Sequence, residues 1–438
     1  MMNSNFDRFC DRTMAAGILQ QLPLFAQNRY RMVDCRILRT RLKIFKKAHR
    51  SFLNVCYEVK FNDLAGSETR SEILLLRAFC DGRSEIEFQQ HQTTGDVYLL
   101  PEMDAIVYRF PCDPKLPQLA ELLDTETVMR HLPFPGLPPA VAAPELIKKI
   151  DIRIAHYYPE HRCTAKYMLH STLHGEHQPV AIYGKIFRDS GGQQTYRNLL
   201  VARESLRHPD DFSTPKPIHY CPKTHTLWME NINATPLPEM LKSGVQPDIL
   251  FAIGKALRQF HTRKLPLDLR IETNLDLPEV AKKAEKIARS FPAFSLPINR
   301  LINGFRSNPP IAASELCTLH GDFHANQLAF SGKQLFLFDF DEISLGEAEW
   351  DLASFIVDVQ MKNYPKWQVE AMISALISGY CDANPSAVSA DRLTYYICMQ
   401  LLTKAYRLCT YRSHLKNLTA QITRLIGLME IENRVFEI

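Results

Sequence analysis

The sequence predicts an α+β protein in which a β-rich part is followed by a helical part, and three observations support this prediction. Residues 33–110 contain alternating, β-branched and aromatic runs separated by polar clusters, a texture typical of strands. The same texture returns at 148–189 and 224–232, interrupted by one helical segment at 193–207. From residue 233 onward, apolar residues recur at helical spacing. With 438 residues, the chain has room for two or three compact lobes.

Composition narrows the class of protein. Hydrophobic residues make up 46% and charged residues 23%, which is typical of a large buried core and excludes extended disorder. The 52 basic and 48 acidic residues give a net charge of +4, too small a surplus to indicate a nucleic-acid or membrane-surface partner. No apolar run approaches the ~18 residues that a membrane-spanning helix needs. Eleven scattered cysteines without a C-x-x-C pair, and a polar start of the chain, predict a cytoplasmic protein.

A proline-rich segment divides the β-rich part. Residues 133–146 are dense in proline and poor in charge, which favours an extended linker between two compact units. We therefore expect an N-terminal β-rich accessory domain at 1–132, a smaller lobe at 147–232 and a helical lobe at 233–438. The accessory domain carries no catalytic signature, so its role stays open.

The accessory domain shows a faint similarity to the smaller lobe. The runs VDCRI, VCYEVKF and ILLLRAFCD are followed, at a spacing of about 110 residues, by IDIRI, AKYMLHS and AIYGKIFRD. Two interpretations stay open at this point. The accessory domain is a degenerate repeat of the smaller lobe, or the matches reflect only the shared composition of strands.

A short β interlude within the helical part carries the strongest chemical signal. It reads SELCTLHGDFHANQLAFSGKQLFLFDFDE, and Ser331 with Gly332 is a plausible hairpin turn. Asp322 follows an apolar strand, and Asp339 ends the second arm of the hairpin seventeen residues later. We expect both carboxylates to face one space. Phosphoryl transfer from ATP needs an acid that orients the attacking hydroxyl and oxygen ligands that hold Mg²⁺, and this pair supplies both.

The spacing of these residues resembles that of a known family. In the protein-kinase pattern, a metal-binding amide lies five positions after the catalytic aspartate, where this chain has Gln327. The loop reads H-G-D, Asp351 in EWDLASF follows Asp339 by twelve residues, and His261 ends ALRQFH. Together these motifs resemble the aminoglycoside phosphotransferase and choline kinase-like family over residues 148–438. The resemblance implies a bilobal protein-kinase-like fold with a β-rich N-lobe and a helical C-lobe, preceded here by the accessory domain.

The resemblance also implies roles for residues of the helical lobe. Asp322 would be the catalytic base that orients the hydroxyl proton, and Asp339 would bind Mg²⁺ directly. Gln327 stands where the family usually has asparagine; its amide offers the same oxygen on a longer side chain, so we prefer it to the neighbouring Asn326 as the second metal ligand. Asp341 either supports a second metal or faces solvent, and the second interpretation is favoured.

In the smaller lobe, the resemblance assigns four nucleotide-binding residues. Lys185 in AIYGKIF would contact the phosphates of ATP. Glu204 is the acidic residue available on the following helix as a partner for this lysine, although it falls late in that helix. Glu230 and Ile232 in LWMENI would contact adenine through their backbone groups. The turn before the lysine strand, YYPEHRCT, lacks the family's glycines, so backbone N–H groups or Arg162 would cover the phosphates instead.

Several other polar residues have a simpler structural interpretation. His320 and His324 flank Asp322 like a metal pair, but a role in bracing the loop is favoured. The stripe of Arg39, Arg41 and Lys43 alternates with Thr40, Leu42 and Ile44, as on a strand with one wet face, and does not indicate nucleic-acid binding.

The predicted function is ATP- and Mg²⁺-dependent phosphorylation of a hydroxyl on a small molecule, such as a sugar, an aminoglycoside or an amino alcohol. The H-G-D loop and the lack of an A-P-E segment after Asp339 make a protein substrate the poorer choice. Two alternatives are kept: a catalytically impaired pseudokinase that binds nucleotide or acts as a scaffold, and a protein kinase. The sequence indicates neither the acceptor nor the oligomeric state.

Overall fold

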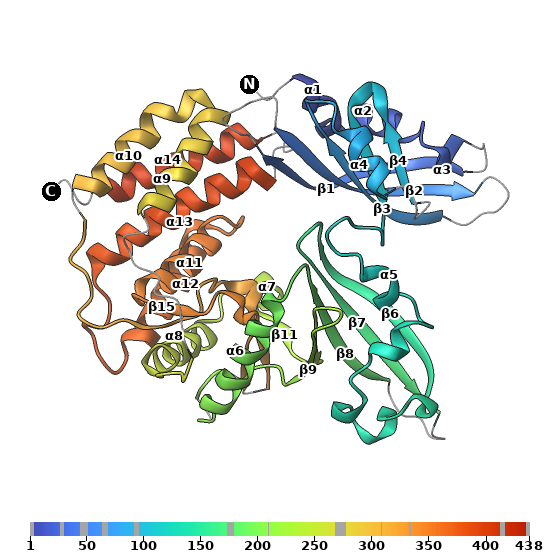
Figure 1. Ribbon diagram of the computed structural model, residues 1–438. Helices are drawn as coiled ribbons and strands as arrows, with labels where there is room; N and C mark the ends of the chain where they lie inside the picture. The colour runs from blue at the N-terminus through green and yellow to red at the C-terminus, as the bar shows by residue number, and fades with distance from the viewer. Residues whose placement is uncertain are drawn as a thin grey trace.

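Two antiparallel sheets and a helical part make up the protein (Figure 1). The computed structural model describes residues 4–26, 30–43, 51–63, 69–91, 96–172, 179–208, 210–267, 277–307, 309–332, 334–411 and 417–434. Within these ranges, every helix is too short or too polar to cross a membrane. The predicted α+β class is confirmed.

The N-terminal sheet has five strands in the order β1-β2-β3-β5-β4. Its strands are β1 (Tyr30–Lys43), β2 (Phe52–Asp63), β3 (Thr69–Ala78), β4 (Val97–Leu100) and β5 (Ala105–Arg109). Side chains alternate between its faces, so Leu74 and Leu76 meet the N-terminal helices while Leu75 faces the opposite side with Phe88. Those helices are α1 (Ser4–Cys10), α2 (Arg12–Leu19) and α3 (Pro23–Ala26), and α4 (Ser84–His91) covers the other face.

The second sheet repeats this arrangement, with the order β6-β7-β8-β10-β9. Its strands are β6 (Ile147–Tyr158), β7 (Arg162–Ser171), β8 (Val180–Phe187), β9 (Pro217–Cys221) and β10 (Thr226–Glu230). In both sheets one helix lies between the third and fourth strands along the chain, α4 in the first and α6 (Gly191–Ser205) in the second. The limits predicted for the domains stay a prediction.

The segment that joins the sheets packs tightly, contrary to the extended linker expected for 133–146. It contains α5 (Leu119–Leu122), η4 (Val128–His131), η5 (Phe134–Gly136), η6 (Pro139–Val141) and η7 (Pro144–Leu146). Leu137 and Val141 are buried against the second sheet together with Tyr167 and Trp228. The prolines shape short helical turns here because the apolar residues between them bury surface on the sheet.

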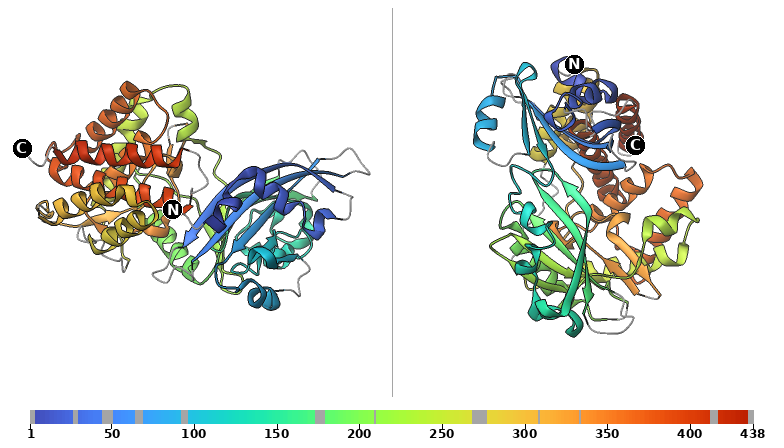
Figure 2. Two further views of the ribbon diagram at one scale, coloured as in Figure 1. Left: turned by 90° about the horizontal axis from the view of Figure 1, so that it is seen from above. Right: turned by 90° about the vertical axis from the view of Figure 1, so that its right-hand side faces the viewer.

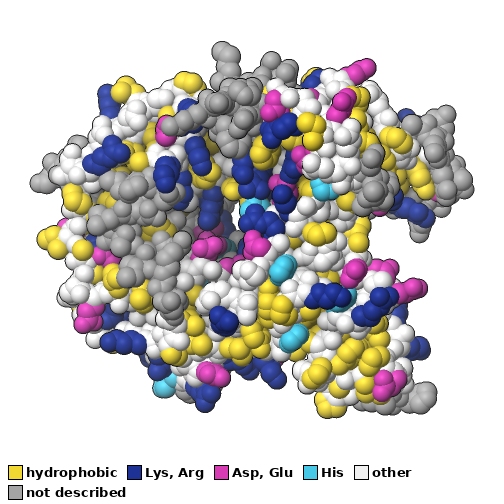
Figure 3. All heavy atoms as spheres, viewed as in Figure 1, with side chains coloured by type: hydrophobic (Ala, Val, Ile, Leu, Met, Phe, Trp, Pro, Cys, Tyr) yellow, Lys and Arg dark blue, Asp and Glu magenta, His cyan; other side chains and the backbone are white. Residues whose placement is uncertain are grey.

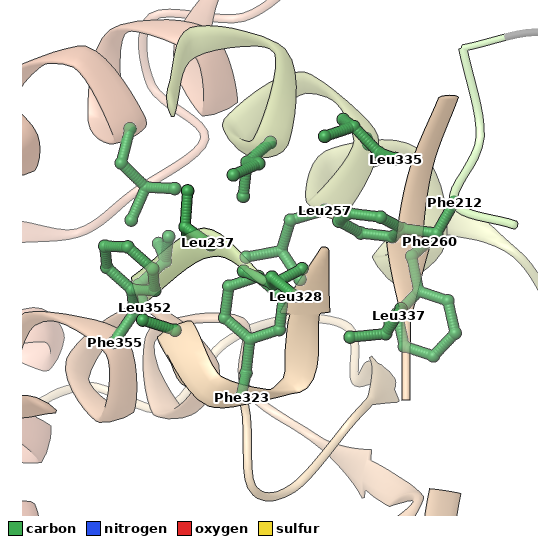
Figure 4. Close-up of a cluster of buried hydrophobic side chains, with 14 of the residues drawn as sticks. Phe212, Leu237, Leu257, Phe260, Phe323, Leu328, Leu335, Leu337, Leu352 and Phe355 are labelled. Carbon is green, nitrogen blue, oxygen red and sulfur yellow. The ribbon is translucent and has the colours of Figure 1, made fainter. Parts of the chain in front are cut away.

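The helical part surrounds the short hairpin that the sequence predicts. Its helices are α7 (Leu237–Lys242), α8 (Pro247–Thr262), α9 (Leu277–Ser290), α10 (Ser295–Ser307), α11 (Glu349–Gln360), α12 (Lys366–Cys381), α13 (Ala390–Tyr411) and α14 (Leu418–Arg434). The hairpin is β13 (Leu328–Ser331) and β14 (Gln334–Leu337), which β11 (Thr235–Pro236) extends, while β12 (Cys317–Leu319) pairs with β15 (Ser344–Gly346). Phe323, Leu328 and Leu337 anchor the hairpin in a buried cluster with Leu257, Phe260 and Phe355 (Figure 4).

The N-terminal sheet also reaches the helical part. Strand β1 packs against α13, so the first sheet touches the helices as well as the second sheet. Figure 2 shows the helical part and the two sheets as separate bodies. The contact between β1 and α13 therefore joins elements from opposite ends of the sequence.

Candidate active site

A glycine allows the loop between β12 and the hairpin to approach the segment after β14. Gly321 has a φ of +85°, and a Cβ atom placed there would lie 2.1 Å from the carbonyl oxygen of Glu342. A side chain at this position would therefore be both strained and sterically excluded. The close approach explains why the chain has H-G-D here, because only glycine brings Asp322 beside the end of the hairpin.

A buried carboxylate fixes the backbone of this loop. Asp351, at the start of α11, accepts hydrogen bonds from the backbone N–H groups of His320 and Gly321 at 2.7 and 3.0 Å. It is fully buried and also contacts the Nε2 atom of His261 at 3.2 Å. His320 is buried and its Nε2 lies 2.8 Å from the carbonyl oxygen of Phe338. The four residues named by the sequence motifs therefore brace one loop against the hairpin.

Asp322 points from this loop toward His324 and Arg407. Its carboxylate lies 3.5 Å from the Nε2 of His324 and 3.7 Å from a guanidinium nitrogen of Arg407 on α13. Burial raises the pKa of Asp322, but His324 and Arg407 lower it by more than burial raises it, so that the pKa falls to about 2. The carboxylate is therefore ionised at neutral pH and can accept a hydrogen bond from a hydroxyl group.

Asp339 lies at the end of β14 in the left-handed conformation, with a φ of +65°. Its carboxylate contacts the Nζ of Lys185 at 2.7 Å and Arg162 at 3.4 Å. Burial opposes ionisation, but these two cations hold the pKa of Asp339 below its usual range. The Nε2 of Gln327 donates a hydrogen bond to the same carboxylate at 3.4 Å. The structure thus brings together Lys185, Gln327 and Asp339, which the sequence analysis singled out.

Asp341 belongs to the same cluster, so its interpretation as a solvent-facing residue is wrong. Both carboxylate oxygens lie 2.7 Å from the Nζ of Lys185, and one accepts a hydrogen bond from Arg162 at 2.5 Å. The hydroxyl of Thr195 on α6 donates to it at 3.0 Å. Asp341 therefore joins the second sheet and α6 to the end of the hairpin.

Asp322 and Asp339 line one cavity of about 330 Å³ between the second sheet and the helical part. The carboxylates of Asp341, Asp189 and Glu342 also line this cavity. Its other lining residues are Tyr158, His161, Arg162, Phe187, Arg188 and Arg407. Lys and Arg side chains gather around the hollow near the centre of the face seen in Figure 3. Carboxylates at the base and cations around them suit a ligand that combines a metal ion with several phosphates.

The oxygen donors beside this cavity fit a Mg²⁺ ion. Asp339 offers a carboxylate, and Gln327 offers an amide whose oxygen and nitrogen can exchange places by rotation. In the part of the chain that the structure describes, no three His, Cys, Asp or Glu side chains form a metal-binding group of their own. Mg²⁺ commonly takes one or two protein carboxylates and completes its shell with water and phosphate oxygens, so two protein donors match its chemistry.

The structure does not bring the remaining predicted nucleotide residues to the cavity. Glu204 is exposed near the end of α6, and the carboxylates that contact Lys185 are those of Asp339 and Asp341. The geometry therefore does not support a Lys185–Glu204 ion pair. Glu230 accepts a hydrogen bond from the backbone N–H of Lys216 at 2.5 Å, and Ile232 is half-buried after β10. Neither Glu230 nor Ile232 lines the cavity described above.

Sequence reasoning missed the contacts that α6 makes with the end of the hairpin. Thr195 bonds Asp341, and the Nδ2 of Asn198 donates to the carbonyl oxygen of Phe340 at 3.1 Å. The signal was two buried polar residues three positions apart on one helix face, where an apolar pair is the ordinary choice. Arg407 left no comparable signal, because it lies 85 residues after Asp322 in the sequence.

Comparison with known proteins agrees with this geometry. The phosphotransferase enzyme family matches residues 186–390, which include α6, the hairpin and α11. No curated protein matches the chain. A solved choline kinase from Cryptosporidium parvum Iowa II superposes with a TM-score of 0.51 at 12% identity, over 72% of this chain and 97% of that one.

Two further solved structures are similar at lower scores. A choline/ethanolamine kinase family protein from Mesorhizobium loti gives a TM-score of 0.42 at 18% identity, over 57% of this chain and 85% of that one. A spectinomycin phosphotransferase in complex with ADP and spectinomycin gives 0.42 at 16%, over 65% and 89%. The choline kinase match shows the fold. The protein has a bilobal protein-kinase-like fold with an additional N-terminal sheet, and its residues 186–390 match the model of the phosphotransferase enzyme family.

Proposed function

We propose that the protein transfers the γ-phosphoryl group of ATP to a hydroxyl of a small molecule, such as a sugar, an aminoglycoside or an amino alcohol, in a Mg²⁺-dependent reaction. The observation that carries the proposal is the convergence of Asp322 and Asp339 on one cavity, with Lys185 held at Asp339. The eleven cysteines, which are scattered along the sequence without a C-x-x-C pair, support a reducing, cytoplasmic location.

In this proposal each group of the cavity has a separate role. Asp322 accepts a hydrogen bond from the acceptor hydroxyl and takes its proton as the phosphoryl group moves. Lys185 and Arg162 contact phosphate oxygens, for which they exchange part of their present contacts with Asp339 and Asp341. Asp339 and Gln327 hold Mg²⁺, which supplies charge neutralisation on the phosphates when bound.

The loop geometry favours an active enzyme over a pseudokinase. Asp351 accepts a buried hydrogen bond from Gly321 and so fixes the loop that presents Asp322 to the cavity, as an enzyme with Asp322 as its base requires. The replacement of asparagine by Gln327 leaves an amide within 3.4 Å of Asp339. The protein-kinase alternative is the weaker one, since the cavity of about 330 Å³ suits a compact acceptor better than a peptide segment.

The test is an ATP-consumption screen of purified protein with Mg²⁺ over sugars, amino alcohols and aminoglycosides. With the best acceptor, Asp322→Asn is expected to reduce kcat by about 10²- to 10⁴-fold, because the proton acceptor is lost. The matched control is Asp151→Asn, which removes a carboxylate that also contacts a histidine and a cation but lies on β6 away from the cavity. Equal turnover by the parent protein and Asp322→Asn would exclude the proposed base.

The two alternatives give different outcomes in the same experiment. A pseudokinase binds ATP without turnover with any acceptor. A protein kinase transfers labelled phosphate to proteins of a lysate and not to the metabolites of a small-molecule library. Phosphorylation of a small molecule by the parent protein excludes the pseudokinase and makes the protein-kinase alternative unnecessary.

A further inference from the structure

The two sheets match beyond the order of their strands, because their polar residues lie in register. Each sheet has a row of three directly paired residues across its first three strands, with a cation on the third strand. The rows are Arg41, Asn54 and Arg77 in the first sheet, and His156, Thr164 and Lys185 in the second. The alignment of ILLLRAFCD with AIYGKIFRD in the sequence places Arg77 opposite Lys185 in the same way. The first sheet therefore carries its own version of the row that holds Lys185.

Arg77 is built into a buried network within the first sheet. It contacts the carboxylate of Glu87 on α4, the helix that corresponds to α6 in chain order. The hydroxyl of Tyr108 donates to the same carboxylate at 3.0 Å, and the Nε of Arg77 donates to Asn54 at 3.2 Å. Lys185 pairs with acids from the hairpin, whereas Arg77 pairs with an acid from its neighbouring helix, so the first row is complete without the helical lobe.

The anion that reaches the first row comes from the second sheet. Glu160, at the tip of the turn between β6 and β7, is only 4% exposed and contacts Arg77. Asn54 donates to its carboxylate at 2.6 Å, and Arg41 lies at 3.3 Å. All three residues of the first row thus converge on one carboxylate. A carboxylate is the side-chain group closest in charge and acceptor geometry to a phosphate oxygen cluster.

The backbone of the same turn is fixed as well. Glu160 adopts a φ of +63°, which is uncommon for a residue with a side chain, and its N–H donates to Asp113 at 2.8 Å. Asp113 is buried and also accepts a hydrogen bond from the hydroxyl of Tyr157 at 2.7 Å. Such a conformation persists only where surrounding contacts determine it. The contacts here come from the N-terminal sheet and from the segment that follows it.

The opposite side of this turn faces the cavity of the candidate active site. His161 and Arg162 directly follow Glu160 and line the cavity, and Arg162 reaches Asp341 at 2.5 Å. The turn contains no glycine, so its backbone is not shaped for close wrapping around phosphates. Contacts from the N-terminal sheet to Glu160 give another way to hold this turn, and with it the side chains of His161 and Arg162, at a fixed position beside the cavity.

We propose that the N-terminal sheet is a duplicated lobe whose row of Arg41, Asn54 and Arg77 anchors Glu160, and that Glu160 is a positioning residue which holds His161 and Arg162 over the nucleotide. The accessory sheet thereby replaces the glycine-rich loop as the device that positions phosphate-contacting groups. The role over the nucleotide rests on the proposed function, whereas the anchoring of the turn does not.

The experiment compares Glu160→Gln with Glu72→Gln. Glu72 forms a two-point ion pair with Arg109 at 2.6 and 2.7 Å, so Glu72→Gln removes a carboxylate–arginine contact from the same sheet but away from the turn. We expect Glu160→Gln to lower kcat/KM for ATP by about 10- to 100-fold through displacement of the turn, and Glu72→Gln to leave it unchanged. Hydrogen–deuterium exchange of residues 156–166, without nucleotide, should accelerate in Glu160→Gln alone.

Each outcome decides one of the two proposals. Unchanged exchange and unchanged kcat/KM in folded Glu160→Gln would overturn the anchoring proposal. Failure of the parent protein to bind Mg²⁺-ATP would instead overturn the proposed function, and the exchange measurement would still test the anchor. If Glu160→Gln does not fold, Asn54→Ala replaces it, because this change removes the 2.6 Å hydrogen bond to Glu160 and leaves every charge in place. Equal exchange in Asn54→Ala and the parent then counts against the anchor.

Discussion

Asp351 holds the backbone of the loop that carries Asp322, although it lies outside the cavity. In Asp351→Asn, the new amide group turns an N–H toward the backbone donors of His320 or Gly321, so one buried hydrogen bond is lost. We expect the free energy of unfolding to fall by about 1–3 kcal/mol. Urea unfolding at pH 7 measures this change, with Asp382→Asn, an exposed residue that follows α12, as the control. An unchanged urea midpoint in Asp351→Asn would contradict the bracing role.

His161 makes the stability of the protein depend on pH. Burial, together with Arg41, Arg188 and Lys43, lowers the pKa of His161 from 6.5 to about 4. As the pH falls from 6.5 to 4, the unfolded chain therefore takes up a proton that the folded protein does not bind. The contribution of His161 to the free energy of unfolding therefore decreases as the pH falls through this window. It is fully present only above pH 6.5.

The measurement of this effect is a series of urea midpoints between pH 7.5 and 5 in steps of about half a unit, for the parent and for His161→Gln. The slope should be shallower in His161→Gln, because this residue no longer titrates in either state. The matched variant is His219→Gln, which replaces an exposed histidine on β9. Parallel slopes for the parent and His161→Gln would show that His161 is not the residue responsible.

At the scale of single residues, the sequence indicated which side chains lie together where the proposed chemistry restricts the choice of residue. Asp322 and Asp339 were predictable because a loop acid and a strand-end acid at this spacing have few other uses. Asp341 was not, because its contacts with Lys185 and Thr195 depend on how the second sheet meets the hairpin. Glu204 was assigned from its position in α6 alone, and it is exposed to solvent.

Two glycines determine how close helices α8 and α12 lie. A Cβ atom on Gly254 would be 2.1 Å from the carbonyl oxygen of Leu376, and one on Gly379 would be 2.0 Å from that of Phe251. The helices thus touch backbone to backbone beneath the cluster that anchors the hairpin. We expect Gly254→Ala to force the helices apart and to lower the free energy of unfolding by about 1–3 kcal/mol.

The matched control for this prediction lies in α14. Among the described residues, no neighbouring atom lies within 4 Å of the place that a Cβ atom on Gly427 would take, so Gly427→Ala adds a methyl group to open space. We expect it to raise the free energy of unfolding by up to ~1 kcal/mol, since alanine is the better helix former. Thermal unfolding of both proteins measures the difference. Equal stabilisation by the two substitutions would show that the helices do not depend on the Gly254 contact.

Most helices and strands were predictable from the periodic spacing of apolar residues. The segment at 133–146 has no such spacing, so its structure was not predictable in this way. The hairpin around Ser331 and Gly332 was predicted because turn residues separate two apolar arms. Prolines without charge were interpreted as an extended linker, because composition carries no information on what a segment packs against. Leu137 and Val141 are buried only because a sheet surface is available beside them.

The N-terminal sheet acts on the whole molecule because it contacts both of the other parts. Glu160 ties it to the second sheet, and β1 packs on α13 of the helical part. The similar runs noted in the sequence lie on strands at equivalent places in the two sheets, and the duplication proposed above would account for this. The contact between the N-terminal sheet and the second sheet could not be predicted, since the buried carboxylate of Glu160, which joins the two sheets, leaves no periodic pattern in the sequence.

Three stacked side chains, one each from β1, β6 and α13, link the N-terminal sheet to α13. The guanidinium of Arg39 on β1 lies 3.7 Å from the ring centre of Tyr158 on β6, and this ring meets Tyr411 of α13 edge to face at 5.9 Å. In Arg39→Met the aliphatic stem is kept but the cation–π attraction is lost, so we expect hydrogen exchange in β1 and in the last turns of α13 to accelerate by about 2- to 30-fold. Lys166→Met is the matched control, because Lys166 lies 5.7 Å from the ring of Tyr183 within a single sheet. Both substitutions remove one cation–π contact. Faster exchange in α13 after Arg39→Met alone would show that the stack joins the sheets to the helices. Equal exchange in both proteins would mean that the contact between β1 and α13 does not depend on the stack.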